Sequence, residues 1–119
     1  MENSESNFNK KLELNNIWIT YDDIGVGKIP ILFLHGFPFN KSKWENQVDF
    51  LKDSYRIITL DIRSFGQSQE NQIETSIDLF TNDLIEFMNA LQLKKVIICG
   101  LSMGGFIALN AVKKYPKRF

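Results

Sequence analysis

Cysteine, histidine and proline are scarce in this chain of 119 residues, which has one cysteine, one histidine and three prolines. A single cysteine, Cys99, excludes an internal disulfide and a zinc cluster, so we expect a cytoplasmic protein that uses no metal and no cofactor. The chain also lacks an excess of charge, because 14 basic residues balance 14 acidic ones. No net field therefore favours nucleic acid or an anionic membrane as a partner.

A long hydrophobic run is also missing. The best candidate for a membrane span, residues 96–109, is shorter than the roughly 20 residues that a span requires, and three glycines interrupt it. We interpret it as core. Residues 1–10 lack the basic and apolar regions of a secretory signal and are expected to form a disordered tail. An apolar fraction of 44% predicts one packed domain over residues 11–119.

Apolar patterning predicts a sheet that begins with a hairpin. Residues 11–14 and 17–22 alternate apolar and polar side chains, and the pair Asn15-Asn16 between them suits a tight turn. Unbroken apolar runs are typical of strands that a parallel sheet buries on both faces. Such runs predict three further strands, within residues 31–34, 55–61 and 94–100.

Helical spacing follows each of the three buried runs. Ser42 and Glu45 fit a capping box for an apolar stripe within residues 44–51. Residues 77–91 predict a long amphipathic helix, and residues 103–116 predict a last helix that a proline ends. This alternation indicates an α/β fold, in which a mostly parallel sheet has flanking helices on both faces and the hairpin forms an antiparallel edge.

A Gly-x-Ser-x-Gly motif occupies residues 100–104, between the third buried strand and the last helix. The sharp turn that this motif forms places its serine, Ser102, in a strained backbone conformation, and Gly100 and Gly104 let strand and helix approach closely. The hydroxyl then lies at a helix N-terminus, where developing negative charge is stabilised. Ser102 is therefore the candidate nucleophile, at a nucleophile elbow, and a chance glycine pattern is the alternative.

Two fixed N–H donors are needed to hold the oxyanion of an acyl-transfer intermediate. The backbone N–H of Met103, directly after the serine, is one candidate. The other is expected in the loop after strand 31–34, where the sequence is HGFP (residues 35–38). We assign this second donor of the oxyanion hole to the backbone N–H of Phe37, and an ordinary Gly-Pro turn is the alternative.

Three motifs in their order along the chain resemble the N-terminal half of the α/β-hydrolase family. They are LHGFP (residues 34–38), DIRSFGQS (61–68) and GLSMGG (100–105). The resemblance implies a truncated α/β-hydrolase fold and a serine esterase that cleaves carboxylic esters, lactones or thioesters through an acyl-enzyme. Family members that resemble peroxidases or lyases also use serine, so the reaction class stays open.

The resemblance also assigns roles to the middle motif. It implies that Asp61 and Arg63 hold their loop together and take no part in catalysis. The chain departs from the family at Ser64, where glycine is usual, and we expect this departure to affect loop geometry without touching the nucleophile.

The partners that activate a serine do not follow it in this sequence. In this fold an acid and then a histidine come after the nucleophile, but residues 103–119 contain no Asp, Glu or His. We expect His35 to support its loop and Cys99 to be a small buried residue. The chain is then the N-terminal portion of a hydrolase and inactive alone, with a bare strand edge at residues 96–99. The alternative is a non-catalytic module or split half whose edge pairs with a C-terminal half, another partner chain or a second copy.

Overall fold

The computed structural model describes residues 7–14, 17–70 and 74–119. Its strands are β1 (Lys10–Leu14), β2 (Ile17–Ile24), β3 (Ile31–Leu34), β4 (Ile57–Leu60) and β5 (Ile97–Gly100). Its α-helices are α1 (Glu45–Leu51), α2 (Ile77–Ala90) and α3 (Met103–Lys114), with short 3-10 turns η2 (Lys41–Trp44) and η3 (Pro116–Arg118). Among the described residues, no helix combines the length and apolar character that crossing a membrane requires.

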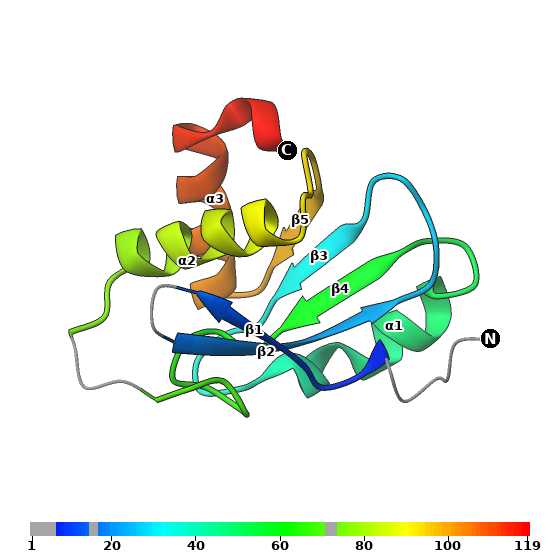
Figure 1. Cartoon of the computed structure of the whole chain (residues 1–119), viewed down its shortest axis with the longest axis horizontal. Coiled ribbons are helices and arrows are strands. Elements are labelled where there is room, and N and C mark those ends of the chain that lie inside the picture. The colour runs from blue at the N-terminus through cyan, green and yellow to red at the C-terminus, as the bar shows by residue number, and fades with distance from the viewer. Residues whose placement is uncertain (1–6, 15–16, 71–73) are drawn as a thin grey trace.

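The five strands form one mixed sheet in the order β1-β2-β4-β3-β5 (Figure 1). β1 pairs antiparallel with β2, which confirms the predicted hairpin, and its predicted turn at Asn15-Asn16 lies outside the described residues. β3 lies between β4 and β5 and pairs parallel with both. Leu34 is opposite Leu60 on one side and Gly100 on the other. The three parallel strands therefore end level, and the loops that carry the three motifs begin at one edge of the sheet.

Helices cover both faces of the sheet, as the sequence predicts (Figure 1). The larger buried cluster joins one face of the sheet to α2 and α3 through residues such as Leu34, Phe87 and Ile107. The smaller cluster lies on the other face, where Phe33 and Ile57 pack with Trp44 and Val48 at the start of α1. The two central strands, β3 and β4, are buried between these layers, which explains their unbroken apolar runs.

The N-terminal cap of the first helical segment differs from the prediction. Asn40, and not Ser42, supplies the cap: its side chain accepts a hydrogen bond from the Ser42 N–H at 2.9 Å, at the start of η2. α1 then begins at Glu45 without a side-chain cap. The predicted capping box is therefore wrong, because a 3-10 turn precedes the α-helix and moves the free N–H groups upstream. The stripe itself is confirmed, since Trp44 and Val48 are buried.

The expected disordered tail at residues 1–10 needs correction. Lys10 belongs to β1 and the Asn9 N–H donates to Asp22 at 2.7 Å, so residues 7–10 are held against the sheet, while residues 1–6 lie outside the described part.

The interpretation of residues 96–109 as core is wrong for one side of that segment. Ile97 is 54% exposed and Cys99 is only half-buried, because β5 is the last strand of the described sheet.

Candidate active site

Ser102 lies at a sharp turn between β5 and α3. Its backbone has φ +53° and ψ −112°, a region that residues with a side chain rarely occupy. The helix begins immediately, because the Gly104 N–H donates to the Leu101 carbonyl at 2.9 Å and the Phe106 N–H to the Ser102 carbonyl at 3.1 Å. The predicted strained conformation of Ser102 is thus confirmed.

Close backbone contact explains the glycines on either side of the serine. A Cβ atom on Gly100 would overlap the Gly104 carbonyl oxygen. One on Gly104 would overlap the Leu34 carbonyl oxygen and lie 2.8 Å from the His35 carbonyl oxygen. The first turn of α3 therefore rests directly on the ends of β3 and β5, as the motif requires.

The loop after β3 packs against the serine turn. A Cβ atom on Gly36 would lie 3.0 Å from the Leu101 carbonyl oxygen and 3.3 Å from the Ser102 Cβ. The next residue, Phe37, is 68% exposed, and its ring stands edge-on to that of Phe65 with centroids 5.7 Å apart. The structure thus brings the loop of Phe37 and the turn of Ser102 and Met103 together.

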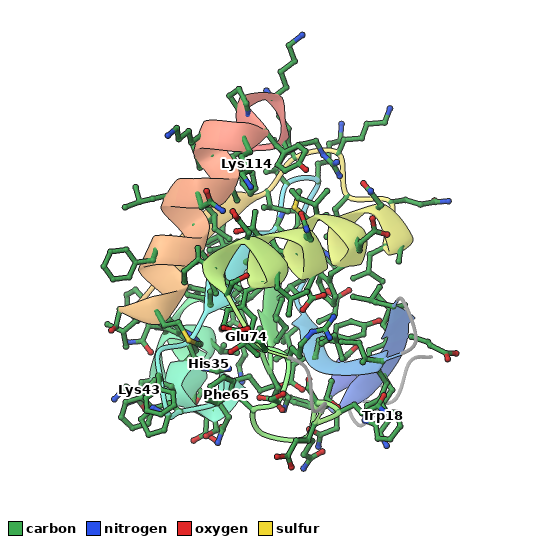
Figure 2. All side chains as sticks on the ribbon, turned by 90° about the vertical axis from the view of Figure 1, so that its left-hand side faces the viewer. Trp18, His35, Lys43, Phe65, Glu74 and Lys114 are labelled. Atoms are coloured by element: carbon green, nitrogen blue, oxygen red, sulfur yellow. The ribbon has the colours of Figure 1, made fainter. Side chains whose placement is uncertain are left out.

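His35 is fully buried between this loop and the loop after β4. Its Nε2 accepts the Ile62 N–H at 3.0 Å, which leaves Nδ1 protonated to donate to the Gly36 carbonyl at 3.0 Å. Figure 2 places the ring beside Phe65, at 5.5 Å between centroids. Burial lowers the pKa of His35 because it disfavours the charged ring. Both nitrogens serve backbone groups, so the expected structural role is confirmed.

Asp61 and Arg63 organise the loop after β4, as the resemblance implies. The Asp61 carboxylate accepts the Lys41 N–H at 2.7 Å and the Gln67 N–H at 2.9 Å. Arg63 donates two hydrogen bonds, each 2.8 Å long, to Asp83 on α2. Sequence reasoning missed Asp83. The sequence could have indicated it, because Asp83 lies beside Phe80 and Leu84 in the buried stripe of α2. A carboxylate that is buried in this way requires a cationic or hydrogen-bonding partner.

Ser64 shows why glycine suits its position. Its φ is +71°, in the left-handed region, and its buried hydroxyl has no hydrogen-bond partner among the residues that the structure describes. The loop nevertheless keeps its hydrogen bonds, including that from the Ser64 N–H to the Gln69 carbonyl at 3.2 Å.

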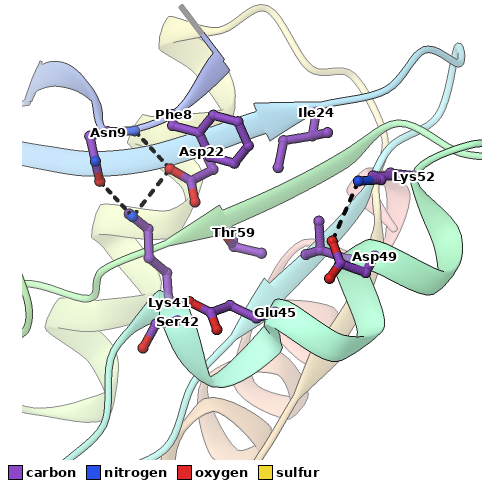
Figure 3. Close-up of a pocket in the computed structure, with 11 residues that line it drawn as sticks. Phe8, Asn9, Asp22, Ile24, Lys41, Ser42, Glu45, Asp49, Lys52 and Thr59 are labelled. Atoms are coloured by element: carbon purple, nitrogen blue, oxygen red, sulfur yellow. Dashed lines mark hydrogen bonds and ion pairs between the residues drawn. The ribbon is translucent and has the colours of Figure 1, made fainter. Parts of the chain in front are cut away.

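A separate hollow of about 350 Å³ lies between α1 and β2, away from Ser102 (Figure 3). Four of its charged side chains form two ion pairs, Lys41 with Asp22 at 3.1 Å and Lys52 with Asp49 at 3.5 Å, and Glu45 also lines it. Within the described ranges, no three His, Cys, Asp or Glu side chains are placed to hold a metal ion. No histidine or cysteine is among the described residues that line this hollow, and its one serine, Ser42, lies in the 3-10 turn η2, so Ser102 remains the candidate for chemistry.

Comparison with known proteins gives consistent matches. Residues 29–119 match the family described as the alpha/beta hydrolase fold. A protein of Synechocystis sp., provisionally named a non-heme chloroperoxidase, is 42% identical over 98 residues, which cover 82% of this chain and 35% of that protein.

Two solved structures share both the fold and recognisable sequence. A thermophilic esterase from Thermogutta terrifontis superposes with a TM-score of 0.82 at 37% identity, covering 86% of this chain and 38% of the esterase. Est816, described as an N-acyl homoserine lactone degrading enzyme, gives 0.86 at 30% identity, covering 92% of this chain and 42% of its own. The chain thus spans about two fifths of the length of the relatives it matches.

Proposed function

This chain belongs to the alpha/beta hydrolase family, and from that premise we propose that it is the serine-carrying, N-terminal portion of a hydrolase for carboxylic esters, lactones or thioesters. The observation that carries the proposal is the strained turn at Ser102 with the loop of Gly36 packed against it. Strain at a non-glycine residue persists only where the surrounding structure imposes it, and it clusters at sites of function.

In the proposed reaction the Ser102 oxygen attacks the substrate carbonyl, and the N–H groups of Phe37 and Met103 hold the resulting oxyanion. Collapse of this intermediate breaks the bond to the alcohol or thiol and leaves an acyl group on Ser102. Water then attacks the acyl carbonyl and releases the acid. A histidine must take the serine proton and pass it to the leaving group, and an acid must orient that histidine.

His35 does not supply this base in the proposal, because both of its nitrogens are bonded to backbone groups. We assign the histidine and the acid to polypeptide outside this sequence, so the 119 residues alone are inactive. Ser102 favours acyl transfer over the chemistry of family members whose nucleophile at this turn is aspartate.

A second candidate is a non-catalytic module that pairs with another chain. The exposed apolar side chains Ile97, Phe106 and Leu109 along β5 and α3 favour it. The two candidates differ in one respect that can be measured, namely whether Ser102 turns over substrate once the rest of a hydrolase domain is present.

The test is a chimera in which residues 1–119 replace the matching portion of the Thermogutta terrifontis esterase. We expect hydrolysis of a short-chain p-nitrophenyl ester, with a loss of at least about 10³-fold in kcat on Ser102→Ala. The control Ser54→Ala, at an exposed serine beyond α1, should keep full activity. A folded chimera that is inactive, or one that keeps its activity after Ser102→Ala, would refute the proposal.

A further inference from the structure

The overall balance of charge does not hold along the length of the chain. All 14 acidic residues precede position 87, whereas six of the 14 basic residues follow it. These six are Lys94, Lys95, Lys113, Lys114, Lys117 and Arg118. Charge asymmetry between two parts of a sequence suggests a partner of opposite charge. The balance that argues against anionic partners therefore applies to the whole chain and not to residues 87–119.

The fold gathers the six basic residues on one surface, which we call the basic end. The Arg118 guanidinium donates to the carbonyls of Leu93 at 2.8 Å and Lys94 at 3.0 Å. The Val96 N–H donates to the Arg118 carbonyl at 3.0 Å. These bonds hold η3 against the segment that precedes β5, and the C-terminal end of α3 lies beside both (Figure 1).

The basic end lies away from the candidate active site. Its segment 93–96 precedes β5, whereas Ser102 follows that strand, so the two lie at opposite edges of the sheet. Figure 2 likewise shows Lys114 near the top of the molecule and His35, from the loop that packs against the Ser102 turn, near the bottom. A partner bound at the basic end therefore leaves the Ser102 turn accessible.

Most lysines of the basic end lack a carboxylate partner within the part of the chain that the structure describes. Lys114 pairs with Asp78 at 2.6 Å, and no other lysine of the basic end forms an ion pair there. The unpaired lysines, all exposed, are Lys94, Lys95, Lys113 and Lys117. The dipole of α3 favours a cation at Lys113, but the other three lie outside any α-helix. Like charges repel one another, and an anionic partner removes this repulsion.

A hollow of about 520 Å³ opens at the same end. Its described lining consists of Asn89, Gln92, Leu93, Lys94 and Arg118, so it offers amide and cationic donors and no carboxylate. Phosphate and carboxylate oxygens accept hydrogen bonds from such donors. The hollow thus suits one anionic headgroup, while the unpaired lysines face the headgroups around it.

We propose that the basic end binds the surface of a membrane that contains anionic phospholipids. Clusters of four to eight basic residues attract such surfaces. Lysine is a compact point charge, which suits an array of headgroups without fixed geometry, whereas planar bidentate recognition of nucleic acid uses arginine. Arg118 is not free for that use, because its guanidinium donates to two backbone carbonyls. Nucleic acid is therefore the less suitable polyanion.

The experiment is flotation of the 119-residue chain with lipid vesicles, since aggregated protein does not float. We expect binding to phosphatidylcholine vesicles that contain about 30% phosphatidylserine and none to pure phosphatidylcholine. Raising the salt from about 0.1 M to about 0.5 M should release the chain. Substitution of the four unpaired lysines by glutamine should lower the partition coefficient by about fivefold each, and by at least about a hundredfold together.

A matched variant replaces four exposed lysines elsewhere by glutamine and changes the net charge equally. These are Lys11, Lys28, Lys43 and Lys52. Because salt screens distant charges, this variant should bind within about threefold of the unchanged chain. The esterase chimera should bind the anionic vesicles with or without Ser102→Ala, which separates this inference from the proposed chemistry.

Three results would overturn the inference. The first is no binding to the anionic vesicles, or equal binding to the neutral ones. The second is an equal loss of binding in the two lysine variants, which would assign the effect to net charge and not to the basic end. The third is tighter binding to a short DNA duplex than to the anionic vesicles at the same phosphate concentration, which would identify nucleic acid as the partner.

Discussion

Substitution of the two adjacent glycines of α3 by alanine should have opposite effects on stability. Both lie inside a helix, where alanine is favoured over glycine by about 0.8–1 kcal/mol. At Gly105 the new Cβ would lie 3.5 Å from the Gly100 carbonyl oxygen, an ordinary contact. At Gly104 it would lie 2.7 Å from the Leu34 carbonyl carbon and 2.8 Å from the His35 carbonyl oxygen, and both are rigid backbone atoms.

The magnitudes follow from these contacts. Gly105→Ala should stabilise the chain by about 0.5–1 kcal/mol. Gly104→Ala forces α3 away from β3, and since overpacking costs about 1–3 kcal/mol or more, we expect a net loss of about 2 kcal/mol. Urea unfolding followed by tryptophan fluorescence should show a midpoint lower by about 1 M for Gly104→Ala and higher by a few tenths of 1 M for Gly105→Ala. Equal midpoints for the two variants would refute the close approach of α3 to β3.

Three further predictions concern the loops around Ser102. Burial lowers the pKa of His35 in the folded chain, so on acidification the unfolded chain takes up this proton at a higher pH than the folded chain does. The contribution of His35 to the free energy of unfolding should therefore be complete above pH 6.5 and be lost as the pH falls from 6.5 through the folded pKa. Urea midpoints measured between pH 7.5 and 5.5 check this, and His35→Asn should make the midpoint depend less steeply on pH. Ser64→Gly should raise stability by about 1 kcal/mol, because it removes a side chain from a left-handed backbone position and a buried hydroxyl that has no partner within the described part of the chain; an unchanged urea midpoint would contradict that reasoning. The 119-residue chain alone should hydrolyse a p-nitrophenyl ester no faster than a Ser102→Ala chain, and any excess rate would show that a base is present.

Much of the fold can be predicted from the sequence because its strongest patterns are local. The run Ile31–Leu34 is a strand with the predicted bounds, since four apolar residues between a proline and the His35-Gly36 loop leave little alternative. The strained Ser102 could be predicted from its motif, because strand, turn and helix are all specified within a few residues. The alternation of strands and helices sets the topology through the handedness of parallel connections.

Features that depend on neighbours were not predictable in the same way. An apolar residue in a central strand and one in an edge strand have the same pattern, so the apolar run alone predicted burial of Ile97, and only the family resemblance indicated the edge at residues 96–99. The cap at Asn40 depends on a 3-10 turn that no periodicity marks. The Arg63–Asp83 pair joins two segments 20 residues apart, and only the packing of α2 on the loop brings them together.

The central claim is that Ser102 carries the acyl group during turnover. Its most direct test is peptide mass mapping of the esterase chimera, quenched with acid while it hydrolyses p-nitrophenyl acetate. The account predicts an acetyl group on the peptide that contains Ser102, absent from the Ser102→Ala chimera. Turnover with the acetyl group on another residue, or turnover that survives in the Ser102→Ala chimera, would contradict it.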